Sequence, residues 1–178
     1  MLLVQQIPAD ASQHDTAHAL LQEGLRRYAQ REGITLPETF VKPVYREDGK
    51  PWFPQLPGVQ FSLSHCRGLA AVLLSRYVCG VDAEGPRPVR PAVIRRAYAP
   101  QEARAIGAAA DPDALYIRLW TLKEAYAKAT GTGIACDLRA LCFSLEGDAV
   151  QTDIPDAAFV QRQYDRFVIS ACILRPSS

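Results

Sequence analysis

The segment that decides the fold runs from Asp111 to Gly133 and reads Asp-Pro-Asp-Ala-Leu-Tyr-Ile-Arg-Leu-Trp-Thr-Leu-Lys-Glu-Ala-Tyr-Ala-Lys-Ala-Thr-Gly-Thr-Gly. Its ends carry the signals of one helix: Asp111 can cap, Pro112 suits the first turn, and Gly131 suits a left-handed stop. Apolar residues recur at helical spacing on one face, namely Leu119, Leu122 and Tyr126. The sequence therefore predicts a core helix over this segment.

A neighbouring face of the same helix carries Trp120, Glu124 and Lys128, each four residues after the previous one. Two interpretations are open at this point. An exposed Glu–Lys pair at this spacing stabilises a helix by roughly 0.2–0.5 kcal/mol. Alternatively, the carboxylate and the ammonium belong to a ligand site, and then other charged residues must lie opposite them.

The composition is that of an ordinary globular protein. Hydrophobic residues make up 48% and charged residues 22% of the 178 residues, and the net charge of +1 predicts neither nucleic acid nor an anionic membrane as a partner. No apolar run approaches the roughly 18–20 residues of a membrane helix, and the N-terminal segment lacks the features of a secretory signal. The 5 cysteines form no C-x-x-C pair, so we expect free thiols in the cytoplasm and no structural zinc site.

The first half of the chain is predicted to contain one helix followed by strands. Apolar residues at helical spacing predict a helix from Asp15 to Arg31 that ends at Gly33. His14 and His18 lie one turn apart at its start. They suit a metal pair or, since no third ligand stands near, polar residues on the outer or cleft-facing side. A short strand is expected from Phe40 to Tyr45.

A stiff turn follows that strand. The segment from Arg46 to Pro54 contains a glycine and two prolines. Lys50 lies between Gly49 and Pro51 in this turn. It is either an ordinary turn lysine or a cation that the loop presents to a ligand.

Two strands come next, and the first ends in polar residues. From Val59 to His65 the residues alternate, which predicts three inward side chains (Val59, Phe61, Leu63) and three outward ones (Gln60, Ser62, Ser64). The adjacent Ser64 and His65 do not suit a serine hydrolase, because neighbours on a strand point to opposite faces and no G-x-S-x-G motif precedes them. Leu69 to Ser75 is predicted to be a buried strand.

Asp82 and Glu84 are two residues apart on a further expected strand, Tyr77 to Glu84. Both carboxylates therefore leave the same face, and Gly80 leaves room beside them. Two negative charges this close repel each other unless a cation lies between them, and a hard divalent ion with oxygen ligands meets that need. A solvated edge strand and one half of a metal site both fit this pattern.

The second half of the chain repeats the order of the first. After a proline-rich link, Gly85 to Pro91, a helix begins near Pro100, and the long helix follows it. Strands are expected at Leu141–Leu145, Phe159–Tyr164 and Phe167–Ile173, the last two as a hairpin across Asp165-Arg166. The repeated order predicts an α+β fold with two lobes, residues 1–90 and 91–178, and a cleft between them.

The most basic patch of the sequence lies around the link and contains Arg87, Arg90, Arg95 and Arg96. Such a patch is either a solvated face or a docking site for an acidic partner.

Three segments carry a resemblance in their order and spacing. They are Gly49-Lys-Pro with Phe61-Ser-Leu-Ser-His65, Gly80-Val-Asp-Ala-Glu84, and Trp120-Thr-Leu-Lys-Glu-Ala-Tyr-Ala-Lys128. This ordered set resembles the 4′-phosphopantetheinyl transferases of the surfactin-synthetase-activating (Sfp-like) type, from about Asp15 to the C-terminus. The resemblance implies a monomer with two similar α+β lobes, related by a pseudo-two-fold axis, and an active site in the cleft between them.

The resemblance also implies an activity. Enzymes of this family transfer the 4′-phosphopantetheine group of coenzyme A to a serine of an apo acyl or peptidyl carrier protein and release 3′,5′-ADP. Asp82, Glu84 and Glu124 match the family's Mg²⁺ ligands, and Lys128 matches the residue that faces the reacting phosphate.

Further matches concern coenzyme A and the serine proton. Lys123 is expected to help hold a phosphate of coenzyme A, Ser64 and His65 match the binding point of its 3′-phosphate, and Lys50 lies on the loop around the nucleotide. Glu102, in Ala99-Pro-Gln-Glu102, matches a general base proposed in the family. Lys128 or a metal-bound water are alternatives for that proton.

Two residues depart from the family pattern. Ser62 stands where relatives carry Asn, and His18 stands where relatives carry Arg on the first helix. An imidazole binds phosphate less firmly than a guanidinium, so we expect the affinity for coenzyme A to be altered or pH-sensitive. Two other functions stay open: a metal-dependent phosphohydrolase that uses the same carboxylates, and a catalytically impaired homologue that binds coenzyme A or a carrier protein.

Overall fold

Helices and strands alternate irregularly along the chain, as the predicted α+β class requires. The computed structural model describes residues 1–39, 42–133 and 136–175. The elements are, in chain order, β1 (Leu2–Gln6), α1 (Gln13–Glu32), β2 (Val44–Tyr45), β3 (Pro51–Trp52), β4 (Gln60–Cys66), β5 (Leu69–Ser75), β6 (Cys79–Glu84), α2 (Pro91–Ala97), α3 (Pro100–Ala108), α4 (Pro112–Thr130), β7 (Phe143–Glu146), β8 (Ala149–Thr152), β9 (Ala157–Tyr164) and β10 (Phe167–Leu174).

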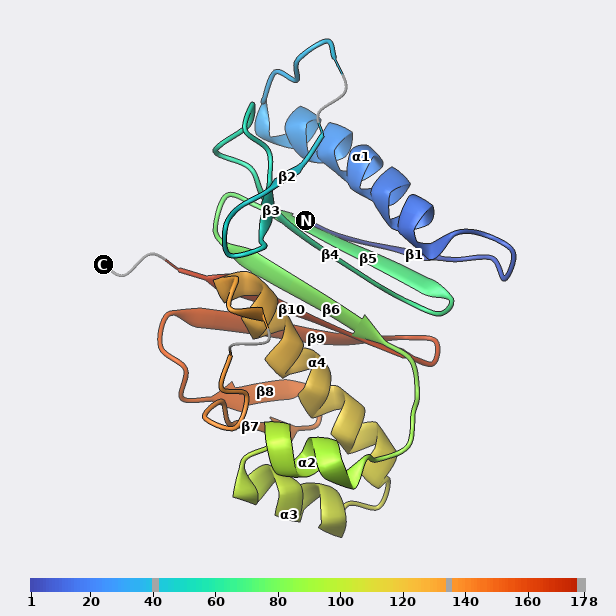
Figure 1. The fold of residues 1–178 in the computed structure, drawn as a ribbon, viewed down its shortest axis with the longest axis vertical. Helices are drawn as coiled ribbons and strands as arrows, with labels where there is room; N and C mark the ends of the chain where they lie inside the picture. The colour runs from blue at the N-terminus through green and yellow to red at the C-terminus, as the bar shows by residue number, and fades with distance from the viewer. Residues whose placement is uncertain (40–41, 134–135, 176–178) are drawn as a thin grey trace.

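Two antiparallel sheets form the centre of the molecule, with strand orders β1-β5-β4 and β6-β10-β9. Helix α1 covers one face of the first sheet, and α4 covers one face of the second (Figure 1). The two remaining faces pack against each other through apolar side chains, among them Leu69 and Leu73 of β5 with Val81 of β6 and Ile169 of β10. Both sheets are therefore covered on both faces, and every residue of β5 is buried, as predicted.

The two long helices begin and end at the residues that the sequence marks. The Ser12 hydroxyl caps α1 by accepting a hydrogen bond from the Asp15 amide at 3.2 Å, and Gly33 ends the helix with φ +67°. The Asp111 carboxylate caps α4 in the same way. Gly131 ends α4 with φ +74°, so the prediction of one helix over this segment is confirmed.

Some elements differ from the sequence-based expectation. The hairpin of β9 and β10 is confirmed, but β1, β8 and α2 were not predicted, because each is short and has no clear periodicity of its own. Of the strand expected from Phe40 to Tyr45, only Val44 and Tyr45 form β2, and residues 40–41 lie outside the described residues.

The predicted outward direction of Ser62 and Ser64 on β4 is wrong. Both side chains are buried between the sheets, each 6% exposed. The Val81 amide donates a hydrogen bond to Ser62 Oγ at 3.0 Å, and the Ala83 amide donates one to Ser64 Oγ at 3.3 Å. The two serines thus satisfy amides on the edge of β6 that is not paired with β10, which explains why polar residues occupy a buried face.

We expect the Ser62→Ala variant to be less stable than the wild type by about 1–3 kcal/mol, because the Val81 amide would stay buried without its acceptor. Urea unfolding measures the difference in the free energy of unfolding. The matched control is Ser144→Ala on β7, where the side chain is exposed and a change within about 0.5 kcal/mol is expected. Equal stability of the two variants would contradict this role of Ser62.

The division into lobes 1–90 and 91–178, and the pseudo-two-fold axis between them, stay predictions. Strand β6 lies before residue 90 and forms its ladder with β10, which belongs to the second half.

Within the described residues, no helix is both long enough and apolar enough to span a membrane. Cys79 and Cys172 are buried as free thiols, and burial raises the pKa of each to about 12.

Candidate active site

Strand β6 and helix α4 approach each other closely at Gly80. A Cβ atom at this position would overlap the α4 backbone. Because side chains alternate along a strand, Asp82 and Glu84 leave β6 on the same side as Gly80. The close approach therefore sets both carboxylates beside the face of α4 that carries Glu124 and Lys128.

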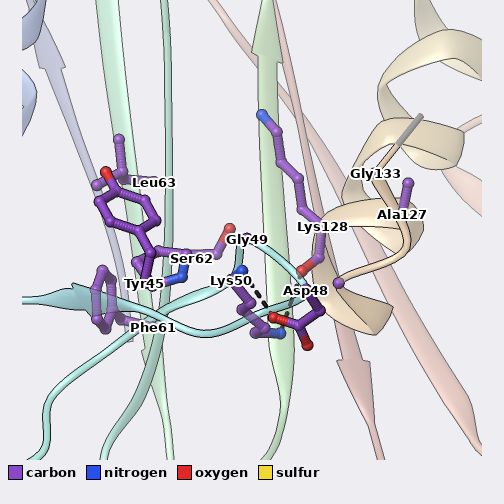
Figure 2. Close-up of a pocket in the computed structure, with 12 residues that line it drawn as sticks. Tyr45, Asp48, Gly49, Lys50, Phe61, Ser62, Leu63, Ala127, Lys128 and Gly133 are labelled. Carbon is purple, nitrogen blue, oxygen red and sulfur yellow. Dashed lines mark hydrogen bonds between the residues drawn. The ribbon is translucent and has the colours of Figure 1, made fainter. Parts of the chain in front are cut away.

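Two cavities meet at Lys128. The smaller, of about 280 Å³, lies between the turn before β3 and the C-terminal end of α4, and its walls include Tyr45, Asp48, Lys50, Phe61 and Ser62 (Figure 2). The larger, of about 570 Å³, lies between α2 and α4, and its walls include Val93, Arg96, Trp120, Glu124 and Leu138. Lys128 and Gly133 line both cavities.

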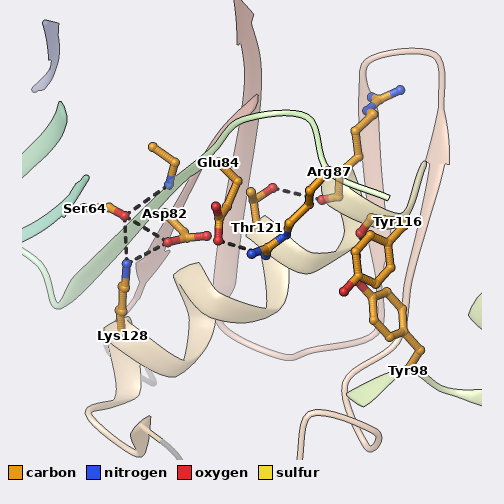
Figure 3. A network of polar contacts seen from close by, with 10 residues as sticks. Ser64, Asp82, Glu84, Arg87, Tyr98, Tyr116, Thr121 and Lys128 are labelled. Carbon is orange, nitrogen blue, oxygen red and sulfur yellow. Dashed lines mark hydrogen bonds and ion pairs between the residues drawn. The ribbon is translucent and has the colours of Figure 1, made fainter. Parts of the chain in front are cut away.

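A hydrogen-bonded network connects β4, β6 and α4 at this junction (Figure 3). The Lys128 ammonium lies 2.7 Å from Asp82 Oδ1 and donates a second hydrogen bond to Ser64 Oγ at 3.0 Å. The Ser64 hydroxyl donates to Asp82 Oδ1 at 3.0 Å. Lys128 therefore pairs with a carboxylate of another element and not with Glu124 of its own helix face.

Glu84 has a cationic partner of its own. Arg87 Nη2 lies 2.9 Å from Glu84 Oε1 (Figure 3). The Arg87 guanidinium carbon also lies over the Trp120 ring, 5.5 Å from the ring centroid. Sequence reasoning placed Arg87 only in a basic patch. The signal that could have found this pair is its spacing, three residues after Glu84 in a link stiffened by prolines.

The three carboxyl groups affect one another. Burial, and then the negative charge of Asp82, raise the pKa of Glu84 above its usual range, while Arg87 and Lys128 oppose the rise. The pKa of Glu124 is raised by burial and by Asp82 in the same way. Asp82 Oδ2 is buried and has no hydrogen-bond partner within the described residues. A buried oxygen without a donor, beside two mutually repelling carboxyl groups, is a favourable place for a cation.

This donor set fits Mg²⁺, because hard divalent ions prefer carboxylate oxygens and keep several waters. As the side chains stand, no group of three or more His, Cys, Asp or Glu residues in the described part of the chain is arranged to hold a metal. A bound ion would need the carboxylates of Asp82, Glu84 and Glu124 to turn towards one point.

Lys123 and Glu102 lie elsewhere than expected. They form an ion pair of 2.8 Å in which both side chains are 0% exposed. Lys123 also donates to the backbone carbonyls of Leu138 and Leu141, and Glu102 accepts from the amides of Ala99 and Phe143. Their hydrogen-bonding capacity is used inside the protein, so neither side chain reaches a phosphate or a serine hydroxyl in this conformation. A sequence motif does not show whether a side chain is exposed or buried. The sequence alone therefore placed both Lys123 and Glu102 at the site.

Lys50 also differs from the expectation of a cation presented to a nucleotide. Its side chain is 6% exposed, and its ammonium donates to three backbone carbonyls. Lys50 thus lines the smaller cavity together with Asp48, Gly49 and Pro51 of the turn, while its ammonium is bonded to the backbone.

The expected 3′-phosphate residues divide between the core and the surface. Ser64 is buried in the network described above, whereas the His65 side chain at the end of β4 is exposed. His18 is half-buried on α1, and its ring lies 4.2 Å from the ring of His14. Burial, and then repulsion from His14 and His65, lower the pKa of His18, while the nearby Asp15 carboxylate opposes this. The three histidines of the chain thus gather at one end of α1.

Comparisons with known proteins identify a family for this chain. A family model described as the 4′-phosphopantetheinyl transferase superfamily matches residues 78–172, which include β6, α4 and most of β10. The chain is 28% identical over 172 residues to the 4′-phosphopantetheinyl transferase psf-1 of Bacillus pumilus, covering 92% of this chain and 74% of that protein. It is 38% identical over 104 residues to the 4′-phosphopantetheinyl transferase HetI of a Nostoc species, covering 53% of this chain and 44% of that protein. Among solved structures, the holo-[acyl-carrier-protein] synthase of Thermotoga maritima aligns with a TM-score of 0.46 and 21% identity, over 57% of this chain and 65% of that one.

Proposed function

The chain belongs to the 4′-phosphopantetheinyl transferase superfamily, and we propose that it transfers the 4′-phosphopantetheine group of coenzyme A to a serine of an apo acyl or peptidyl carrier protein. In this reaction the serine oxygen forms a bond to the phosphorus that bears the pantetheine. The bond from that phosphorus to the bridging oxygen breaks, 3′,5′-ADP leaves with the bridging oxygen, and the serine proton is released to solvent.

One observation carries this proposal: Lys128 lines both cavities, and its ammonium is held by the buried Asp82 carboxylate. Coenzyme A has a nucleotide at one end, a pantetheine arm at the other and a diphosphate between them. The smaller cavity, with Tyr45 and Phe61 on its walls, suits the adenine base, and the 3′-phosphate would lie outside it, towards His65 and His18. The larger cavity, with Val93 and Leu138 on its walls, suits the pantetheine arm. The diphosphate then lies at Lys128, where its charge is neutralised.

Asp82, Glu84 and Glu124 would hold Mg²⁺ at this junction. The ion, when bound, neutralises charge on the diphosphate and on the leaving group. Lys128 contributes a fixed positive charge beside the reacting phosphorus, and Ser64 holds the ammonium in place by a hydrogen bond. We do not assign the serine proton to Glu102, because its two oxygens already accept hydrogen bonds in the core.

The carrier protein is expected to approach over α2. Arg96 lines the larger cavity, and Arg90, Arg95 and Arg96 are exposed on or beside this helix. The nearest part of the surface is therefore positively charged. An acidic carrier would gain from this charge mainly in its rate of association, which falls as salt increases.

A single assay tests the proposal. The protein is incubated with coenzyme A, Mg²⁺ and an apo acyl or peptidyl carrier protein, and the mass of the carrier is measured by mass spectrometry. A gain of the phosphopantetheine mass supports transfer. Hydrolysis of coenzyme A with an unmodified carrier would indicate a phosphohydrolase instead, and binding with neither change would indicate a non-catalytic homologue.

We expect coenzyme A to bind more weakly at pH 8 than at pH 6. Burial and neighbouring imidazoles keep the pKa of His18 low in the free protein, and a bound phosphate would raise it. Binding then takes up a proton, so the affinity is greatest at low pH and falls as the pH rises through the bound-state pKa. The change is about tenfold for each pKa unit gained on binding. Calorimetry at both pH values measures it.

The His18→Arg variant provides the comparison, because a guanidinium keeps its charge over this range. It should bind coenzyme A more tightly than the wild type at pH 8, with a smaller dependence on pH. An unchanged or weaker dissociation constant for this variant would argue against a phosphate contact at His18.

A further inference from the structure

The buried ammonium of Lys50 joins three backbone segments that are distant in the sequence. It donates to the Cys79 carbonyl of β6 at 3.0 Å and to the carbonyls of Lys128 and Ala129 of α4 at 3.1 and 2.5 Å (Figure 2 shows the turn that carries it). An ammonium has three donors, so all of them are used. Cys79 lies three residues before Asp82, and Lys128 is itself the cation of the site.

The setting of this lysine is unusual for a buried charge. Within the described residues no carboxylate forms an ion pair with it, and burial lowers the pKa of Lys50. The ammonium is instead placed at the C-terminal end of α4, where the unpaired carbonyls carry a partial negative charge. It thus serves as the cap of the helix that bears Glu124 and Lys128.

A second contact holds the turn of Lys50 against the same helix end. The Lys50 amide donates to Asp48 Oδ1 at 2.9 Å, which closes the turn. A Cβ atom at Gly131, the residue that ends α4, would lie 2.8 Å from Asp48 Oδ2. A side chain at residue 131 would therefore displace the Asp48 carboxylate, which lies against the end of α4.

We propose that Lys50 is a positioning residue: its ammonium fixes the end of α4 against β6 and thereby sets the Lys128 ammonium at Asp82. This inference rests on the proposed function, because the distance it controls matters only if Lys128 acts on a phosphate. It replaces the expectation that the Lys50 side chain binds the nucleotide.

The test is a double-mutant cycle between Lys50→Met and Lys128→Ala, measured as kcat and KM of transfer at a temperature well below unfolding. Methionine keeps the length of the side chain and removes all three donors. Because a misplacement of about 1 Å can cost up to ~10²-fold in rate, we expect Lys50→Met to lower kcat by about tenfold or more. In the Lys128→Ala background the same change should lower the residual kcat by less than about twofold.

Several outcomes would overturn the inference. An equal loss in both backgrounds would mean that Lys50 acts on stability alone. A raised KM for coenzyme A with unchanged kcat would mean that the side chain contacts the nucleotide. The matched control is Lys42→Met, an exposed lysine at which no change is expected. Should Lys50→Met fail to fold, Asp48→Ala, which loosens the same turn, takes its place in the cycle with the same expected pattern.

Hydrogen exchange separates this inference from the proposed function. In Lys50→Met the amides in the last turn of α4 should exchange at least about tenfold faster, while those of β5 stay protected. Unchanged exchange of the amides in the last turn of α4 would show that Lys50 does not hold the helix end, even if the enzyme is active. If the wild type transfers nothing to any carrier, the proposed function is wrong, and exchange alone decides whether Lys50 holds the helix.

Discussion

Replacing Gly80 with alanine is expected to abolish transfer and to destabilise the protein. The added Cβ would overlap the carbonyl oxygen of Ala125 and lie 2.5 Å from the amide nitrogen of Ala129. Both are backbone atoms of α4, so no side chain can rotate away, and the helix must move off β6. Overpacking of a core typically costs about 1–3 kcal/mol, and we expect this variant to reach or exceed the upper value. A shift of α4 also separates Asp82 from Lys128.

Thermal or urea unfolding and the carrier-modification assay measure the two effects. Gly107→Ala is the matched control. Gly107 lies in α3, and a methyl group added there would have nothing within 4 Å, so alanine should stabilise the helix by roughly 0.5–1 kcal/mol and leave transfer unchanged. If Gly80→Ala is as stable and as active as Gly107→Ala, the close approach of α4 to β6 is not what holds the site together.

The second large effect is expected for Asp82→Asn. This change keeps the shape of the side chain and removes the charge that pairs with Lys128 and that would contact Mg²⁺. Charge stabilisation by a bound metal supplies several kcal/mol to such reactions, so we expect kcat to fall by about 10²-fold or more. The fold should persist, because an amide can still accept from Ser64 and Lys128. Glu124→Ala is expected to lose transfer for the same reason.

Initial rates over a series of Mg²⁺ concentrations measure this effect, with circular dichroism to verify folding. Asp153→Asn, at an exposed position, is the charge-matched control and should behave as the wild type. Near-normal turnover of Asp82→Asn at limiting Mg²⁺ would show that the metal assignment is wrong.

Much of the local structure follows from residues that act on their own neighbours. Asp111 and Gly131 mark the ends of α4 because a cap and a left-handed stop are local events, and both are confirmed. The spacing of Asp82 and Glu84 places them on one face of a strand for the same reason, since alternation depends on the strand alone. The short elements α2, β1 and β8 were not predicted, because packing stabilises them and their sequences have no clear hydrophobic periodicity.

The sequence also located the family and the segments that build the site, and the family model agrees with that resemblance. The roles expected for Lys123, Glu102 and Lys50 stay predictions, although the structure places all three side chains in the interior. A motif specifies that a charge is present, but not which way it points. In the structure, these charges meet buried partners that come from distant parts of the chain.

The segment from Asp111 to Gly133 separates what the sequence determines from what the tertiary structure decides. By itself the sequence determined that it is a helix, where the helix ends, and that Glu124 and Lys128 share a face, because capping and the 3.6-residue period act within one segment. Only the tertiary structure decided that this face meets Asp82 across Gly80 and that Lys50 caps the helix end. Those contacts join residues dozens of positions apart, and their geometry depends on how closely two backbones can pack.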